Sequence, residues 1–151
     1  MKAAWGLLLA ILLLPGCSSQ PLAAAPARSF SIHLADAQPA PGRVPMLDRE
    51  GRRWWVEMPA RLCCKDIRSA ELMFDEQNQP LLVLSLDMEA GARLAQLSRE
   101  HVGRGMAVLV DGELQMAATL RGEIRGGQLA LRGFASVDEA QRLLAPRPPR
   151  P

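Results

Sequence analysis

The chain has 151 residues, of which 48% are hydrophobic and 23% are charged, and its formal net charge at pH 7 is +2. Basic and acidic residues interleave along the sequence and form no basic stripe, which argues against a nucleic-acid-binding protein. Beyond the first 16 residues no apolar stretch approaches the length of a bilayer span, so we expect no membrane-spanning segment downstream.

The N-terminus has the organisation of a bacterial signal peptide over residues 1–16. A positively charged end precedes an apolar stretch over residues 3–14, which is shorter than the about 20 residues that span a bilayer. The sequence Leu-Pro-Gly-Cys that ends at Cys17 resembles the lipobox of bacterial lipoproteins. This resemblance implies that Cys17 carries acyl chains, which anchor the protein stably on a membrane when there are two or more. A plain secretory signal with an incidental cysteine, or an uncleaved anchor, are the alternative interpretations.

The segments that flank the expected domain have compositions that cannot form a packed core. Residues 17–28 predict a flexible tether between the lipid and the domain. Residues 145–151 are rich in Pro and Arg and predict an extended tail, which is either a solvated end or a proline-rich ligand. Ser18 after the lipidated cysteine resembles outer-membrane sorting. We therefore expect an envelope protein that faces the periplasm, at the outer membrane rather than the inner one.

A single domain is expected over residues 29–144, and its first half contains two alternating segments. Residues 30–34 predict a short strand, and a polar turn at 48–51 leads into a second strand over residues 52–58. Adjacent residues of a strand point to opposite faces. The apolar set, which we expect in the core, comprises Trp54, Val56 and Met58. The opposite set comprises Arg53, Trp55 and Glu57.

Trp55 is therefore expected to be at least partly exposed, on the same side as Arg53. An exposed Trp is a frequent anchor at protein interfaces. This makes Trp55 and Arg53 the candidate partner-binding residues. The alternative is that Trp55 lies beneath the N-terminal segment or a helix.

Two adjacent cysteines, Cys63 and Cys64, follow this strand. Neighbouring Cα atoms are about 3.8 Å apart, so a disulfide between them would be strained. Two thiols without further Cys or His nearby also make a poor metal site. We expect one small buried residue and one half-exposed residue, and a redox role is the alternative. The next segment, residues 66–74, is compatible with either a helical turn or an irregular strand.

Two helices are predicted in the second half from their capping residues. Asp87 is placed to cap a helix that begins at Met88 and ends before Gly103. Ser136 and Glu139 form a capping-box pattern at the start of the second helix. The first helix has an apolar face that comprises Ala90, Leu94 and Leu97, with His101 at its end. The second has Val137, Ala140, Leu143 and Leu144.

Strands are predicted over residues 81–86, 106–110, 113–120 and 128–132. Asp111-Gly112 between the middle two is a strong signal for a tight hairpin turn, which needs positive φ. Gly105 is expected to lie in a looser connection. The order strand, helix, hairpin, strand, helix predicts an α+β fold, with two helices packed on one face of a mainly antiparallel sheet.

The sequence contains no recognisable catalytic constellation. Ser98 and the other serines lack the pattern of a nucleophilic triad, and His101 lies on a helix face beside aliphatic residues. Residues 103–105 are too short for a phosphate loop and follow a helix instead of preceding one. We expect no enzyme, no cofactor and no metal site, with an enzyme kept as the least favoured alternative.

A set of turn glycines, apolar strand positions and helix positions recurs in a known family. Its upstream positions are Asp66, Ile67, Ala70 and Pro80. The downstream positions are Val83, Leu84, Leu86, Gly91, Leu94, Gly103, Ala107, Asp111, Gly112, Ile124, Gly126, Gly127, Gly133, Phe134, Glu139, Ala140, Leu143 and Leu144. With these positions the stretch from Pro80 to Leu144 resembles the periplasmic head domain of SecD, a membrane subunit that assists the protein-export translocase. The sequence departs from the family at Ser98, where Thr is usual, and at Ala118, where Pro is common.

The resemblance implies a head-like domain that contacts unfolded or secreted polypeptide and is tethered by lipid. SecD also has a base domain and a transmembrane bundle that uses proton flow, and we expect this chain to have neither and to be no motor. Our leading hypothesis is a lipid-anchored periplasmic protein-binding module that is accessory to protein export or envelope protein handling. The alternative is a structural or regulatory envelope lipoprotein that reuses the fold without a role in export. The oligomeric state is left open.

Overall fold

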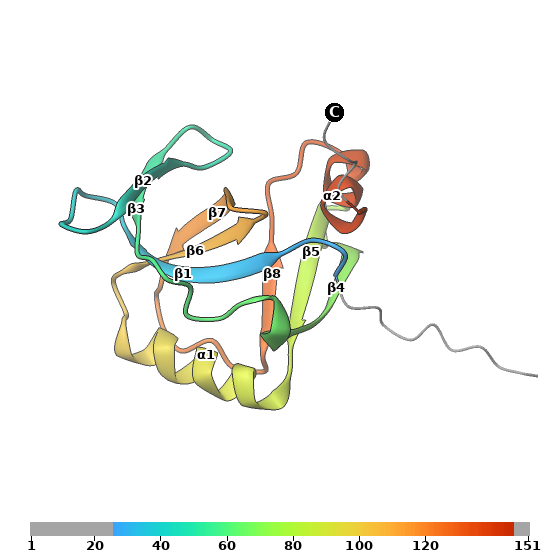
Figure 1. The fold of residues 1–151 in the computed structure, drawn as a ribbon. Helices are drawn as coiled ribbons and strands as arrows, with labels where there is room; N and C mark the ends of the chain where they lie inside the picture. The colour runs from blue at the N-terminus through green and yellow to red at the C-terminus, as the bar shows by residue number, and fades with distance from the viewer. Residues whose placement is uncertain (1–25, 147–151) are drawn as a thin grey trace, which may run out of the picture.

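The computed structural model describes residues 26–146, which form two antiparallel sheets and two α-helices (Figure 1). The predicted signal peptide, the lipidation at Cys17, most of the tether and residues 147–151 lie outside the described residues. The strands are β1 (Phe30–Asp36), β2 (Val44–Leu47), β3 (Arg53–Val56), β4 (Ile67–Phe74), β5 (Pro80–Leu86), β6 (Gly105–Val110), β7 (Glu113–Thr119) and β8 (Gln128–Leu131). The helices are α1 (Met88–Glu100) and α2 (Val137–Leu144), and a short 3-10 turn spans Cys64–Asp66.

The larger sheet has the strand order β2-β3-β1-β6-β7. β1 pairs with β6 from one end to the other, whereas β3 joins β1 only at its last residues, where Ala35 lies opposite Val56. Because this contact is so short, the β2–β3 hairpin extends beyond the body of the sheet (Figure 1).

The smaller sheet has the order β4-β5-β8, and its apolar face turns toward the larger sheet. In Figure 1, α1 lies along the lower end of the two sheets and α2 at the upper end beside β4 and β5. Side chains from both sheets and both helices form one main core. Its members include Phe30, Ile32, Leu34, Leu82, Leu84, Leu94, Val108, Leu131, Phe134 and Ala140.

A second apolar cluster lies on the other face of the larger sheet, because alternate residues of a strand point to opposite faces. We call it the outer cluster, and its members are Ala35, Trp54, Val56, Ala107, Leu109, Leu114 and Ala117, with Met46 packed against them. The larger sheet is therefore apolar on both faces near its centre.

The predicted α+β class is confirmed, with a different arrangement of the sheets. The strands divide into two sheets because β8 pairs with β5 and not with β7. In the segment 66–74, which the sequence left undecided, Ile67–Phe74 form a strand with a bulge between Ile67 and Ser69. β2 was not predicted.

Two expectations about individual residues are wrong. Met58 is 48% exposed, because β3 ends at Val56 and the alternation does not continue. Gly105 is not in a loose connection but is the first residue of β6, where it is buried. A bulge in the β6–β7 pairing reverses the alternation, so Leu114 lies in the outer cluster while Met116 packs against the main core.

The short-range signals are confirmed. Asp87 accepts a hydrogen bond from the Ala90 N–H at 2.7 Å, and the Ser136 hydroxyl accepts one from the Glu139 N–H at 3.2 Å. Asp111 and Gly112 both have positive φ, as the tight hairpin requires. Within residues 26–146, neither helix has the length and apolar character needed to cross a membrane.

Candidate functional site

The β2–β3 turn is organised around the carboxylate of Asp48. It accepts hydrogen bonds from the backbone N–H of Glu50 at 3.1 Å and of Arg52 at 2.8 Å, from the Arg52 Nε at 2.8 Å, and from the Trp54 Nε1 at 3.0 Å. Burial alone would raise the pKa of Asp48, but the hydrogen bonds from Arg52 and Trp54 outweigh it, so the pKa lies below its ordinary value. The sequence showed Asp48 only as part of a polar turn.

The indole of Trp54 packs against the sheet at Gly105, where the lack of a side chain leaves room for the ring. A Cβ at Gly105 would lie 2.6 Å from the Trp54 Cζ3, closer than real contacts allow, and 3.0 Å from the Ala35 carbonyl oxygen, which is a tight contact. The indole is 7% exposed, so the predicted burial of Trp54 is confirmed, in the outer cluster instead of the main core.

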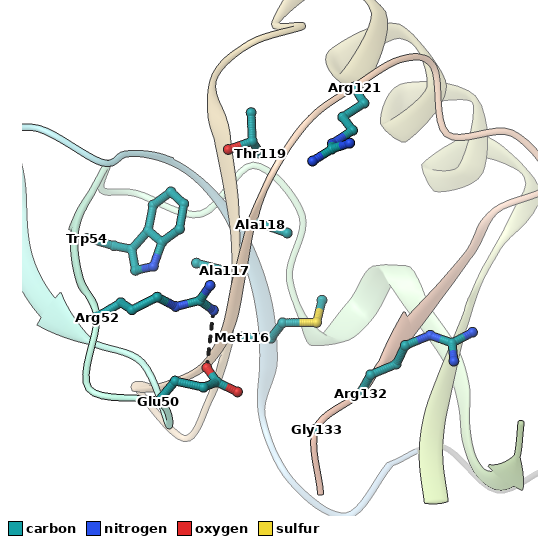
Figure 2. Close-up of a pocket in the computed structure, with 10 residues that line it drawn as sticks. All are labelled: Glu50, Arg52, Trp54, Met116, Ala117, Ala118, Thr119, Arg121, Arg132 and Gly133. Carbon is teal, nitrogen blue, oxygen red and sulfur yellow. Dashed lines mark hydrogen bonds and ion pairs between the residues drawn. The ribbon is translucent and has the colours of Figure 1, made fainter. Parts of the chain in front are cut away.

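A groove of about 460 Å³ opens beside Trp54 (Figure 2). One wall is the β2–β3 turn, one is β7, and the last is the end of β8. Three arginines line it, one in the β2–β3 turn and two that follow β7 and β8, together with one acidic residue: Arg52, Arg121, Arg132 and Glu50. Arg52 pairs with Asp48 and Glu50, and Arg132 pairs with Asp75, whereas Arg121 has no ion pair within residues 26–146. No sequence signal pointed to this groove, because its walls come from three distant segments.

Trp55 and Arg53 lie on the opposite side of β3 from Trp54. Trp55 is half-buried and Arg53 is exposed, so the expectation that Trp55 is at least partly exposed is confirmed. In the sheet, Trp55 lies opposite Asp36 of β1 and Pro45 of β2. Residues directly opposite in an antiparallel pair point to the same face, so Trp55 and Asp36 share a side.

That side carries a network of ion pairs. Arg43 and Arg104 each contact both Asp36 and Glu57, and Arg61 also pairs with Glu57. Burial alone would raise the pKa of Glu57, but hydrogen bonds from Arg61 and Arg104 outweigh it and lower the pKa. The network fixes the end of β1 and the residue that follows β3, close to Trp55.

The two cysteines do not form a site together. Cys63 is half-buried and Cys64 is exposed, and both are free thiols, so the expectation that one of them is buried is wrong. The Cys63 N–H donates to the Asp66 carboxylate at 2.8 Å, and Asp66 also pairs with Arg93 of α1. Within the described residues, no cluster of three or more His, Cys, Asp or Glu side chains is arranged to hold a metal ion.

Comparison with known proteins relates this chain to a protein family. A family model described as the SecDF P1 head subdomain matches residues 40–145. The SecDF translocase subunit of Thermus thermophilus is 29% identical over 85 residues, which cover 56% of this chain and 12% of that protein. The SecD subunit of Treponema pallidum is 33% identical over 79 residues, covering 52% of this chain and 13% of that protein.

The similarity extends to solved structures. A structure of SecDF, described as a membrane component that enhances protein export, aligns with a TM-score of 0.63 at 19% identity, over 80% of this chain and 61% of that chain. At this identity the alignment shows the fold. The chain spans less than a quarter of the length of the curated relatives named above. The match of the family model over most of the described domain shows that this chain belongs to the SecDF P1 head subdomain family.

Proposed function

We propose that this chain is a lipid-anchored periplasmic module that binds secreted or envelope polypeptides and assists protein export without catalysing a reaction. The observation that carries the proposal is the family match over residues 40–145. The relatives are named as subunits of the protein translocase, and one solved relative is described as enhancing protein export.

Trp55 and Arg53 are the residues that we propose to contact the polypeptide. A half-buried Trp offers a large apolar surface at a small cost in conformational entropy, and its position is fixed by β1 on one side and β2 on the other. The exposed Arg53 beside it adds a charged donor at the rim. The ion-pair network on the same side keeps this surface in place when a partner binds.

The proposal is tested by cross-linking in intact cells, followed by identification of the captured proteins. Trp55→Ala and Arg53→Ala should reduce the capture of secreted polypeptides and translocase subunits. Met88→Ala is the matched control, because Met88 is a 93% exposed apolar side chain on α1, a different element. Its capture should equal that of the wild type. Unchanged capture in Trp55→Ala would contradict the assignment of Trp55 as a contact residue. If the wild type captures neither secreted polypeptides nor translocase subunits, the result would favour an envelope lipoprotein without a role in export.

The lipid anchor is tested separately. Cys17→Ala should abolish labelling by fatty acid and leave the protein unprocessed or released from the membrane, whereas Ser18→Ala should keep the label. Labelling that persists in Cys17→Ala would contradict the anchor. Fractionation of the wild type would place it at the outer or the inner membrane.

A further inference from the structure

The smaller sheet ends in a long strand with an unpaired edge. β4 has eight residues and is hydrogen-bonded to β5 alone among the strands of residues 26–146. Proteins usually protect such edges with Pro, Lys, bulges or a covering segment. β4 contains neither Pro nor Lys, and its bulge lies at one end, between Ile67 and Ser69.

The phase of the hydrogen bonds shows which backbone groups face the open edge. The Asp75 N–H donates to the Gln79 carbonyl at 3.0 Å, and hydrogen-bonded pairs alternate with non-hydrogen-bonded pairs along an antiparallel ladder. The N–H and C=O groups that point away from β5 are therefore those of Ala70, Leu72 and Phe74. Within the described residues, no hydrogen bond occupies these groups.

Two features of β5 agree with this phase. Pro80 lies opposite Phe74, in a pair that needs no N–H from it. On the other side of β5, the Leu86 N–H donates to the Gly127 carbonyl at 2.8 Å, as expected when the even-numbered residues of β5 bond toward β8.

The open edge is also apolar. Met73 is 48% exposed and Phe74 is 50% exposed, although both belong to a strand. Ala70 and Leu72 are half-buried and pack against the main core from the same side as Phe74. The edge thus presents unpaired backbone groups together with apolar side chains that a further strand would cover.

We propose that this edge pairs with the same edge of a second copy of the chain, antiparallel about a two-fold axis at Leu72. Leu72 then lies opposite the second copy's Leu72, and Phe74 lies opposite its Ala70. In this register all three outward-facing residues of each copy meet an outward-facing partner, as an antiparallel ladder requires. Phe74 covers the second copy's Ala70, and the two small sheets become one continuous sheet.

Charge supports the same register. Arg68 lies at the bulge of β4 and Glu76 in the turn that follows it, each four residues from Leu72. Antiparallel pairing about Leu72 therefore brings the Arg68 end of each copy beside the Glu76 end of the other. Both side chains are exposed, and neither has an ion pair within residues 26–146. A register centred on Ala70 or on Phe74 loses this pairing and leaves two of the three outward-facing residues of each copy without an outward-facing partner. The observations therefore favour a second copy over an unrelated extended polypeptide.

Disulfide trapping tests the register in the full chain with Cys63→Ser and Cys64→Ser. Residues in a hydrogen-bonded antiparallel pair have Cα atoms about 5.5 Å apart, within the range for a disulfide. Leu72→Cys should therefore cross-link to itself. Ala70→Cys should not, because two copies of that position are separated by about four residues, roughly 14 Å. A mixture of Ala70→Cys with Phe74→Cys should cross-link between the two variants.

The mass of the full chain in solution, measured by light scattering, is the second readout. The wild type should be a dimer, and Phe74→Lys should be a folded monomer. The control is Leu47→Lys, at a 57% exposed position on β2, which should stay dimeric. A wild type that is monomeric at all concentrations would overturn the proposal, even if its β4 edge binds an unrelated strand. Equal cross-linking of Leu72→Cys and Ala70→Cys would also overturn it. Trp55→Ala should remain a dimer, so this inference and the proposed function fail separately.

Discussion

The two faces of the larger sheet are built in different ways. The main core contains many aliphatic side chains from both sheets and both helices, so each residue contributes a modest part of the buried surface. The outer cluster is smaller and centres on one indole, that of Trp54, which lies on Gly105 and is held by Asp48. A cluster that depends on one large side chain should be more sensitive to a single substitution than a core whose buried surface is distributed over many side chains.

The outer cluster also lies nearer to the features that we associate with function. Trp54 lines the groove of Figure 2, and Trp55 on the opposite side of the same strand is the proposed contact residue. The orientation of β3 therefore depends on Trp54, while the proposed binding depends on Trp55.

Removal of the indole is expected to have the largest effect. Trp54→Ala should lower the free energy of unfolding by about 3–5 kcal/mol, because it leaves a cavity and removes one of the hydrogen-bond donors to the Asp48 carboxylate. The measurement is denaturant unfolding of the purified chain. A loss below that of a single aliphatic truncation would show that the outer cluster adds little to stability.

In the main core, Leu94→Ala and Leu131→Ala should each cost about 2–5 kcal/mol, since both side chains are almost fully buried. The denaturant midpoint of each variant, compared with that of Trp54→Ala, shows how evenly the stability of the core is distributed over its side chains. Midpoints equal to the wild type would contradict the assignment of these residues to the core.

A substitution at Gly105 tests the packing of the Trp54 indole against this position. Gly105→Ala should cost about 1–3 kcal/mol through overpacking, because the added methyl group meets Trp54 and the Ala35 carbonyl. Gly112→Ala is the control, with open space around its Cβ and φ of 84° as its main constraint. It should cost about 1 kcal/mol from backbone strain alone. A larger loss of unfolding free energy in Gly112→Ala than in Gly105→Ala would contradict the close packing of Trp54 against Gly105.

Acid should weaken the outer cluster through Asp48. Its pKa is lower in the folded chain than the unfolded value of about 3.9, so the stabilisation is present above that value and is lost as the pH falls through the folded pKa. Asp48→Asn should cost about 1–3 kcal/mol at neutral pH and should unfold with a weaker acid dependence than the wild type. Parallel stability curves for the two proteins below about pH 4 would contradict this role.

Short-range signals predicted the second half of the domain well. The cap at Asp87, the turn at Asp111-Gly112 and the cap at Ser136 act within a few residues, so the chain carries them without help from the fold. The buried and exposed sides of Trp54 and Trp55 followed from strand alternation for the same reason.

The features that the sequence did not predict depend on distant segments. β2 is a short edge strand that contains Pro45, and its pairing with β3 defines it more than its composition does. The division into two sheets depends on β8 pairing with β5 across the intervening α1 and β6–β7 hairpin. Gly105 looked like part of a loop because it follows Gly103 and Arg104. The indole of Trp54 and the Ala35 carbonyl, both distant in the sequence, explain why it has no side chain.

We propose that Trp54 maintains the fold while Trp55 binds polypeptide. The most direct measurement is the affinity of the purified full chain for an unfolded secreted polypeptide, before and after Trp55→Ala, with the unfolding midpoint of each protein determined in parallel. A Trp anchor contributes about 2 kcal/mol or more, so we predict a loss of affinity of about thirtyfold with an unchanged midpoint. Unchanged affinity in Trp55→Ala, or a domain that unfolds, would contradict the account.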